Sequence, residues 1–231
     1  MVTTTNTEKA TILPLESGDR LTRQEFEIRY AAMPHVKKAE LIEGVVYLAS
    51  PVRVKHGQPH SAINTWIGTY GALTPGVMVC DNTTVRLDAD NEPQPDVLLR
   101  IDASRGGQSR ISEDNYIEGA PELAVEIAAS SASYDLHDKK RAYRRNGVQE
   151  YLVWQASSQS FTWFSLQAGE YVALTADGSG ILRSQIFPGL WLNVDAFVTG
   201  NLSRVLETLR EGIDSAAHQE FVRQLGSGQG T

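Results

Sequence analysis

Residues 94–99 read QPDVLL, and residues 122–130 read ELAVEIAAS. Each stretch is an apolar run whose interior holds one carboxylate, Asp96 in the first and Glu126 in the second. Continuous runs of small or branched apolar residues are typical of strands buried in a sheet. Because an unpaired buried charge is costly, both acids need compensation. We interpret the pair as ligands of a divalent cation.

The remaining pattern predicts one α/β domain over residues 21–213, between a flexible leader at 1–20 and a C-terminal tail at 214–231. A capping box at Thr22 and Glu25 begins a helix over 22–33, and Glu43-Gly44 joins two short strands within 40–50. Further helices are expected at 61–73, 133–147 and 196–213. Further strands are expected at 77–80, 84–88, 148–154, 160–166, 170–176 and around 190–192.

Composition narrows the class of protein. Hydrophobic content of 41% and charged content of 21% are ordinary for a soluble globular chain. Cys80 is the one cysteine, which excludes a disulfide framework and a cysteine-based zinc site. The N-terminus lacks a signal-peptide pattern, and no apolar run is long enough to span a membrane. We therefore expect a cytoplasmic protein with no membrane partner and no organic cofactor.

The net charge of −7 argues against a protein that coats nucleic acid by bulk electrostatics. A local basic patch could still bind phosphate, and the densest is KKRAYRR at 139–145, with five cations in seven residues. Such a cluster is more often a solvated helix face than a binding site. Its place just after the acidic strands favours the phosphate interpretation.

Two carboxylates on neighbouring strands, followed by a helix that carries Lys139 and Lys140, suit metal-dependent phosphodiester hydrolysis. Mg²⁺ takes oxygen ligands, usually one or two carboxylates with water and substrate phosphate. A nearby ammonium can orient water or neutralise the charge that builds on phosphorus. Carboxylate pairs also hydrolyse glycosides, but uncharged sugars would leave the basic cluster without a role.

At these positions the chain resembles the PD-(D/E)XK nuclease superfamily and, within it, the Uma-two family of restriction endonucleases. The resemblance extends from about residue 21 to residue 200. The motifs that carry it are ELIEG at 40–44, SP at 50–51 followed by His56, QPDVLL at 94–99, GAPELAVEIAASS at 119–131, DLHDKKRAYRRNGVQEYLVW at 135–154 and FPGLWL at 187–192. The 135–154 block is the most specific of these motifs, because a Pro-Asp pair alone is common.

The resemblance implies a restriction-endonuclease-like fold, with a central mixed β-sheet flanked by α-helices and the site at one end of the sheet. It implies that Asp96 and Glu126 bind Mg²⁺, or Mn²⁺ as a substitute, and that Lys139 assists at the phosphate. Glu40 and His56 match further family positions. For Glu40 the alternatives are a ligand, a group acting on water and a strand-edge charge; for His56 they are a phosphate contact and a solvated loop residue.

One departure from the superfamily pattern concerns the lysine of the PD-(D/E)XK motif. In that motif the lysine stands two residues after the second acid, here Glu126, but this chain has Ala128 at that position. The resemblance assigns the role to the following helix, in the register of Lys139. The helical stripe of Leu136 and Tyr143 leaves both Lys139 and Lys140 beside it, so the residues alone do not choose between them.

Two functional hypotheses follow. The first is a Mg²⁺-dependent endonuclease acting on DNA, expected to pair into a homodimer as relatives of the superfamily commonly do. The second is a catalytically inactive nuclease-fold module that binds nucleic acid or protein, which the acidic balance and the displaced lysine favour. His60 and His137 carry no comparable support, and Glu150 and Tyr151 are interpreted as structural.

Overall fold

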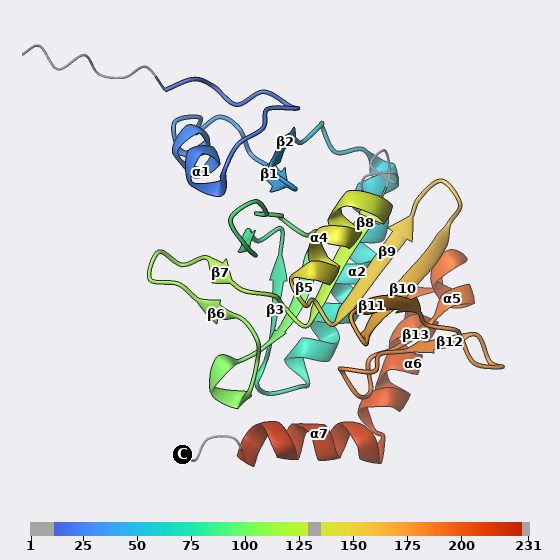
Figure 1. Ribbon diagram of the computed structural model, residues 1–231. Coiled ribbons are helices and arrows are strands. Elements are labelled where there is room, and N and C mark those ends of the chain that lie inside the picture. Colours follow the sequence, from blue (N-terminus) through green and yellow to red (C-terminus); the bar gives the residue numbers. More distant parts are fainter. Residues whose placement is uncertain (1–11, 129–134, 228–231) are drawn as a thin grey trace, which may run out of the picture.

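A mixed six-stranded sheet forms the centre of the protein, for which the computed structural model describes residues 12–128 and 135–227 (Figure 1). The strand order is β11-β10-β9-β8-β5-β3. Strands β8 and β9 are parallel, and the other neighbours are antiparallel. The strands are β3 (Val77–Asp81), β5 (Val97–Ile101), β8 (Leu123–Ala128), β9 (Glu150–Gln155), β10 (Ser160–Gln167) and β11 (Glu170–Ala173). The expected central mixed sheet is confirmed.

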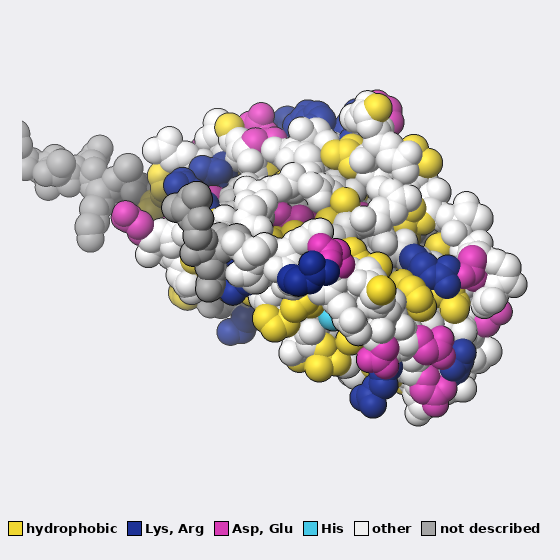
Figure 2. All heavy atoms as spheres, turned by 90° about the horizontal axis from the view of Figure 1, so that it is seen from below, with side chains coloured by type: hydrophobic (Ala, Val, Ile, Leu, Met, Phe, Trp, Pro, Cys, Tyr) yellow, Lys and Arg dark blue, Asp and Glu magenta, His cyan; other side chains and the backbone are white. Residues whose placement is uncertain are grey.

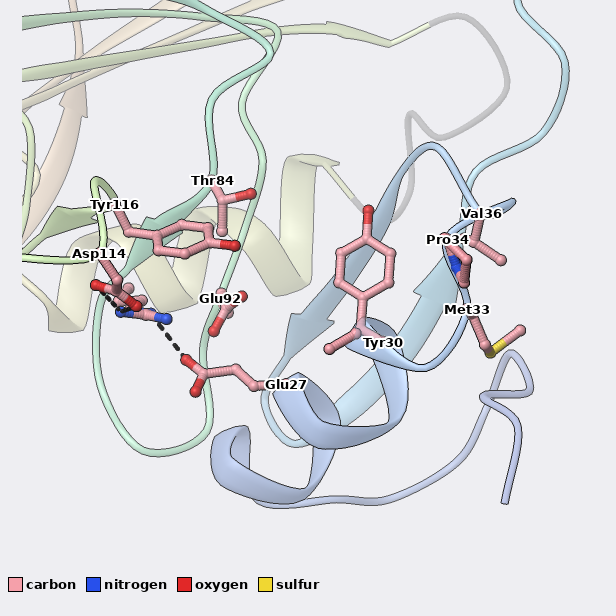
Figure 3. Close-up of a pocket in the computed structure, with 11 residues that line it drawn as sticks. Glu27, Tyr30, Met33, Pro34, Val36, Thr84, Glu92, Asp114 and Tyr116 are labelled. Carbon is pink, nitrogen blue, oxygen red and sulfur yellow. Dashed lines mark hydrogen bonds and ion pairs between the residues drawn. The ribbon is translucent and has the colours of Figure 1, made fainter. Parts of the chain in front are cut away.

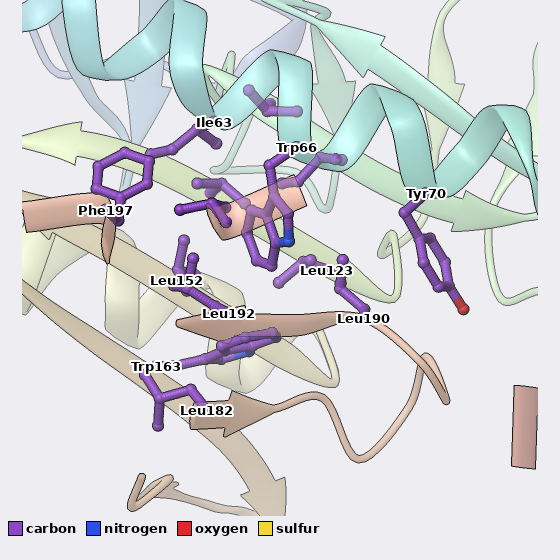
Figure 4. Close-up of a cluster of buried hydrophobic side chains, with 14 of the residues drawn as sticks. Ile63, Trp66, Tyr70, Leu123, Leu152, Trp163, Leu182, Leu190, Leu192 and Phe197 are labelled. Carbon is purple, nitrogen blue, oxygen red and sulfur yellow. The ribbon is translucent and has the colours of Figure 1, made fainter. Parts of the chain in front are cut away.

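Helices cover both faces of this sheet (Figure 1). Helix α2 (Val54–Ala72) packs on one face with α5 (Val194–Val198) and α6 (Leu202–Ile213), and their apolar cluster is drawn in Figure 4. The π-helix η2 (Asp135–Lys139) and helix α4 (Lys140–Arg145) cover the other face, where Tyr143 and Leu136 join a smaller cluster. No helix among the described residues is long and apolar enough to cross a membrane.

Alternation along β8 decides which face receives the acid. Leu123, Val125 and Ile127 belong to the cluster on the α2 face, whereas Ala124 and Ala128 belong to the cluster on the α4 face. Side chains along a strand alternate between faces, so Glu126 projects toward η2 and α4. The apolar residues on either side of Glu126 in the sequence thus pack into two different clusters, one on each face of the sheet.

The N-terminal part forms the expected helix and hairpin. Helix α1 (Arg23–Ala31) begins after Thr22, whose Oγ1 accepts a hydrogen bond from Glu25 N. Strands β1 (Ala39–Ile42) and β2 (Val45–Leu48) pair around the predicted turn, where Glu43 and Gly44 both have positive φ, 52° and 72°. Two positive φ values are the signature of a tight hairpin turn.

Helix α2 begins at Val54, seven residues before the expected start at 61, so His56 lies in its first turn and not in a loop. The reason is a continuous stripe: His56, His60, Ile63 and Ile67 follow one another at helical spacing. The first two members of the stripe are polar, and a search for apolar periodicity therefore misses this part of the helix.

The chain ends also differ from expectation. The predicted helix over 196–213 is divided into α5 and α6 at Gly200, whose φ is +75°. The segment 214–231, expected as a tail, contains helix α7 (Ala216–Ser227), which buries His218 and Leu225. Within the leader, residues 1–11 lie outside the described residues, but Leu15 is buried.

Short strands complete the structure. Strands β4 (Val85–Arg86), β6 (Arg110–Ile111) and β7 (Ile117–Glu118) form a small sheet beside α1, and β12 (Ile181–Arg183) pairs with β13 (Trp191–Asn193). A 3₁₀ turn, η1 (Ala103–Arg105), follows β5. Val85 of β4 and Ile117 of β7 pack against Leu98 of β5, and Leu182 and Leu192 of β12 and β13 join the cluster on the α2 face.

Glu150 joins the C-terminal elements to the main sheet. Its carboxylate accepts hydrogen bonds from Trp163 Nε1 at 3.2 Å, Ser184 Oγ at 2.7 Å, Gln185 N at 2.6 Å and Ile186 N at 3.3 Å. All of these contacts lie away from Asp96 and Glu126, which agrees with the structural interpretation of Glu150.

Replacing Glu150 by alanine is expected to lower the free energy of unfolding by about 2 to 3 kcal/mol, because several buried donors lose their acceptor. Chemical denaturation measures the loss. The exposed Glu16 is the control, and Glu16→Ala is expected to remain within about 0.5 kcal/mol of wild type. Equal stability of the two variants would contradict the role of Glu150.

Candidate active site

Asp96 lies at the start of β5 and is held by contacts on both carboxylate oxygens. Oδ2 accepts a hydrogen bond from Ile127 N at 2.8 Å, and Oδ1 lies 3.2 Å from Lys38 Nζ and 3.6 Å from His56 Nε2. Burial favours the neutral acid, but the charges of Lys38, Lys139 and His56 outweigh it and lower the pKa of Asp96 below its ordinary value. Asp96 is therefore an ionised carboxylate in an almost fully buried position.

Glu126 is surrounded by donors from the opposite helix. Its Oε1 accepts hydrogen bonds from Lys139 Nζ and from the Tyr143 hydroxyl, each at 2.9 Å. Lys139 Nζ also lies 2.8 Å from Glu40 Oε1, which in turn accepts a hydrogen bond from Gln94 N at 2.7 Å. Burial and the charge of Glu126 raise the pKa of Tyr143 well above its ordinary value, so its hydroxyl remains a donor.

The strand register brings the two acids together. Strands β5 and β8 pair Val97 with Val125, Leu98 with Ala124 and Leu99 with Leu123. Extending this register by one residue places Asp96 opposite Glu126. Directly opposed residues of an antiparallel pair project to the same face, so both carboxylates lie on the side covered by η2 and α4.

The five predicted site residues thus meet in one largely buried cluster: Glu40, His56, Asp96, Glu126 and Lys139. The two lysines differ in their contacts: Lys139 contacts both Glu40 and Glu126, whereas Lys140 Nζ lies 3.7 Å from the ring centre of Phe164. We call these five residues, together with Lys38 and Tyr143, the acid–lysine cluster.

The charge compensation of Asp96 and Glu126 differs from the expectation of a divalent cation. Lys38 and Lys139 supply two positive charges from the chain itself, against the three carboxylates of the cluster, which include Glu40. The pKa of Lys38 is raised by Glu40, Asp96 and Glu126 against the opposing effect of burial, so this lysine stays charged. Lysines from the chain therefore offset two of the three carboxylate charges without a metal ion.

Lys38 and Tyr143 were missed as members of the cluster. The sequence holds a signal for Lys38, because it lies two residues before Glu40 and alternation along an extended segment places both on one face. Tyr143 was recognised only as part of an inward helical stripe. His60, set aside in the sequence, lies near the cluster with Nε2 at 3.1 Å from Asp96 O and 2.8 Å from Asp81 Oδ1.

The donor set fits Mg²⁺ better than a metal that needs many protein ligands. Within the described parts of the chain, no group of three or more His, Cys, Asp or Glu residues is arranged to hold a metal ion. Asp96 and Glu126 still supply two carboxylates on one face, and Mg²⁺ commonly binds proteins through one or two carboxylates with water and phosphate in its other positions.

The basic segment 139–145 divides between the interior and the surface. Lys139 points into the acid–lysine cluster, while Arg141 pairs with Asp138 and Arg144 with Glu170 at the surface. On the face shown in Figure 2, cationic and acidic side chains are intermixed. A broad basic surface for nucleic acid is therefore not found on that face.

Comparison with known proteins identifies the family. Residues 23–195, more than half of the chain, match the family described as "Uma2: Putative restriction endonuclease". The chain belongs to the Uma2 family. No curated protein matches the sequence.

Among solved structures, one similar to this Uma2 member is the crystal structure of a "putative nuclease" from Anabaena variabilis ATCC 29413. The match has a TM-score of 0.54 at 14% sequence identity and covers 79% of this chain and 97% of that one. At this level of identity the likeness establishes the shared fold, which is the restriction-endonuclease-like fold expected from the sequence.

Proposed function

We propose that this protein is a Mg²⁺-dependent endonuclease that hydrolyses phosphodiester bonds of DNA. The observation that carries the proposal is the meeting of Asp96, Glu126 and Lys139 on one face of the sheet. Glu126 lies 2.9 Å from Lys139 Nζ, and the charge of Lys139 also acts on Asp96. Two carboxylates and one ammonium form the charge set that phosphodiester hydrolysis needs. Membership in a family described as restriction endonucleases supports the same reaction.

In this proposal, Asp96 and Glu126 hold Mg²⁺, for which Mn²⁺ can substitute. When bound, the ion supplies Lewis acidity toward the phosphodiester and charge that stabilises the leaving oxygen. Ile127 N fixes the orientation of Asp96 through its 2.8 Å hydrogen bond, and Tyr143 does the same for Glu126. The backbone and the helix thus keep the carboxylates ready for the ion.

Lys139 acts on the phosphate. Its ammonium is within 3 Å of both Glu126 and Glu40, so Glu40 holds it in place from the side opposite the strand. As charge builds on the phosphate oxygens, a fixed ammonium stabilises it without having to reorganise. His56 lies beside Asp96 on the α2 side and is placed to contact a phosphate there.

The alternative is a catalytically inactive nuclease-fold module. The observation that favours it is the pairing of Asp96 with Lys38 and of Glu126 with Lys139, because each of these acids then has a cation from the chain itself without a metal. Calorimetry with Mn²⁺ separates the two functions. The endonuclease is expected to bind Mn²⁺ through Asp96 and Glu126, and the inactive module is expected to show no binding that depends on them.

The test of activity uses supercoiled plasmid with Mg²⁺, with Mn²⁺ or with EDTA. We expect nicked or linear product with either metal and none in EDTA, and we expect Asp96→Asn to remove the product. Asp90→Asn is the control, because Asp90 is exposed in the loop before β5. Equal cutting by Asp96→Asn and wild type would refute the proposed function.

A further inference from the structure

A cavity of about 430 Å³ lies outside the acid–lysine cluster, between α1 and the small sheet of β4, β6 and β7. Its walls include Glu27 and Tyr30 from α1, Thr84, and Tyr116 just before β7. Figure 3 shows the two tyrosine rings on either side of Glu92 in this view. The volume lies in the range of small-molecule sites.

Glu92 is the unusual member of this cavity. Its side chain is 3% exposed, and among the described residues its Oε2 has no hydrogen-bond partner. Burial and the neighbouring carboxyl of Glu27 raise the pKa of Glu92 to about 8, against the opposing charges of Arg86 and Arg23. Near neutral pH the group is therefore a protonated carboxyl that shares a hydrogen bond with Glu27, and its Oε2 is the atom left for a ligand.

The cavity wall is not strongly charged. Arg86 lies 2.8 Å from both Glu27 Oε1 and Asp114 Oδ2, and its guanidinium stacks over the Tyr116 ring at 4.1 Å. The two surface acids thus share a cation, and Glu92 carries its proton. An uncharged planar ligand suits this wall better than a phosphate or a metal ion.

The cavity adjoins the acid–lysine cluster. Tyr30 lies close enough to both Glu92 and Lys38 for each of these side chains to shift the pKa of its hydroxyl, and Lys38 pairs with Asp96. Glu92 also exchanges backbone hydrogen bonds with Leu41, the residue after Glu40 in β1. One strand therefore separates the proposed cleavage site from the cavity.

We propose that this cavity binds one unstacked nucleobase of the nucleic acid strand at the cleavage site. Glu92 and Thr84 bond the edge of the base, and Tyr30 and Tyr116 flank its faces. Every nucleobase edge presents adjacent donors and acceptors, and unstacked bases commonly stack on aromatic side chains. Tyr116, at 38% exposed, stands at the entrance of the cavity. This inference rests on the proposed function for the identity of the ligand.

Fluorescence anisotropy with a labelled single-stranded 12-mer tests the inference, first in Ca²⁺ and again in EDTA. The comparison strand is a 12-mer of the same length in which every site is abasic. We expect wild type to bind the base-bearing strand about tenfold more tightly than the abasic strand, the scale of one base–aromatic stack. We expect Tyr116→Ala and Glu92→Ala to lose this preference, and Glu113→Gln, in the same loop as Tyr116 but outside the cavity wall, to keep it.

Preference retained in both cavity variants, or no preference in wild type under either condition, would overturn the inference. Free nucleosides added as competitors test whether the bound base must belong to a strand. If they displace the labelled strand as strongly as an unlabelled strand does, the inference is also overturned. Binding is read without cleavage, so a protein that shows the preference but cuts no plasmid fails only the proposed function. A protein that cuts plasmid while both cavity variants keep the preference of wild type fails only the present inference.

Discussion

Replacing Lys139 by methionine is expected to lower the rate of plasmid cleavage by about 100- to 1000-fold, the usual cost of removing one charge-stabilising donor from an active site. The same change is expected to lower the free energy of unfolding by about 3 to 5 kcal/mol, because Glu40 and Glu126 lose the cation that lies between them. Methionine keeps the length and the apolar stem of the side chain, so the missing charge is the main difference.

The adjacent residue provides a matched control for this variant. Lys140 lies over the ring of Phe164 at the surface, and a cation–π contact of this kind contributes about 1 kcal/mol or less. Lys140→Met is therefore expected to cut DNA at nearly the wild-type rate with nearly wild-type stability. A larger loss of cutting in Lys140→Met than in Lys139→Met would contradict the assignment of Lys139 as the active-site lysine.

Loss of folding in Lys139→Met could imitate loss of catalysis, and a double variant separates the two. Adding Glu40→Gln removes one of the two uncompensated buried charges, so we expect the double variant to regain part of the stability. Cleavage is expected to stay low, because the ammonium is still missing. Recovery of both stability and cleavage would show that Lys139 has only a structural role.

The acidic pair could be predicted from sequence because its signal is local. Asp96 and Glu126 each stand out in an apolar run, and the pairing of two such strands follows from burying both. The choice of Lys139 over Lys140 depended on the resemblance to the family, because both lysines lie beside the apolar stripe of the predicted helix. The place of Lys38 in the cluster could not be predicted without knowing where the β1–β2 hairpin lies relative to the sheet, although its spacing from Glu40 was visible in the sequence.

The correction to His56 has a different cause. Pattern reading locates a helix by its apolar face, and the first turns of α2 present histidines where later turns present isoleucines. These histidines face the sheet end that carries Asp96, so the polar part of the stripe coincides with the candidate site. The polar end of a helix can in this way look like a loop in sequence.

Glu92 could not be predicted at all. In sequence it belongs to the polar loop that precedes QPDVLL, and nothing in the neighbouring residues indicates burial. It is buried because β1 pairs with it and α1 brings Glu27 against it, and both contacts join distant parts of the chain. Residues whose environment is built entirely by long-range contacts leave no local pattern.

Replacing Glu92 by glutamine is expected to stabilise the protein in a pH-dependent manner. The pKa of Glu92 is about 8 in the folded protein and 4.5 as the ordinary value, so between these pH values the folded state holds a proton that the unfolded state has lost. The contribution of Glu92 to stability therefore falls as the pH rises from about 4.5 to about 8, and changes no further above pH 8. Glutamine does not titrate, and its amide resembles the protonated carboxyl.

The difference between Glu92→Gln and wild type is thus expected to be small at pH 5 and to reach about 3 to 5 kcal/mol at pH 8.5, at 1.36 kcal/mol for each pKa unit. Thermal unfolding of both proteins at each pH measures it, as a gain of about 10 °C at pH 8.5. Other groups that titrate in this range, such as Glu150, whose pKa burial raises to about 7, contribute equally to both proteins and cancel.

Glu113→Gln is the control for the loss of one acidic group, because Glu113 is exposed in the loop beside the cavity. Its stability is expected to follow that of wild type across the whole pH range within about 0.5 kcal/mol. A gain in Glu92→Gln that is the same at pH 5 and pH 8.5 would mean that Glu92 carries no extra proton in the folded state. The carboxyl would then face the cavity as an anion, and a base edge rich in donors would be the ligand to expect there.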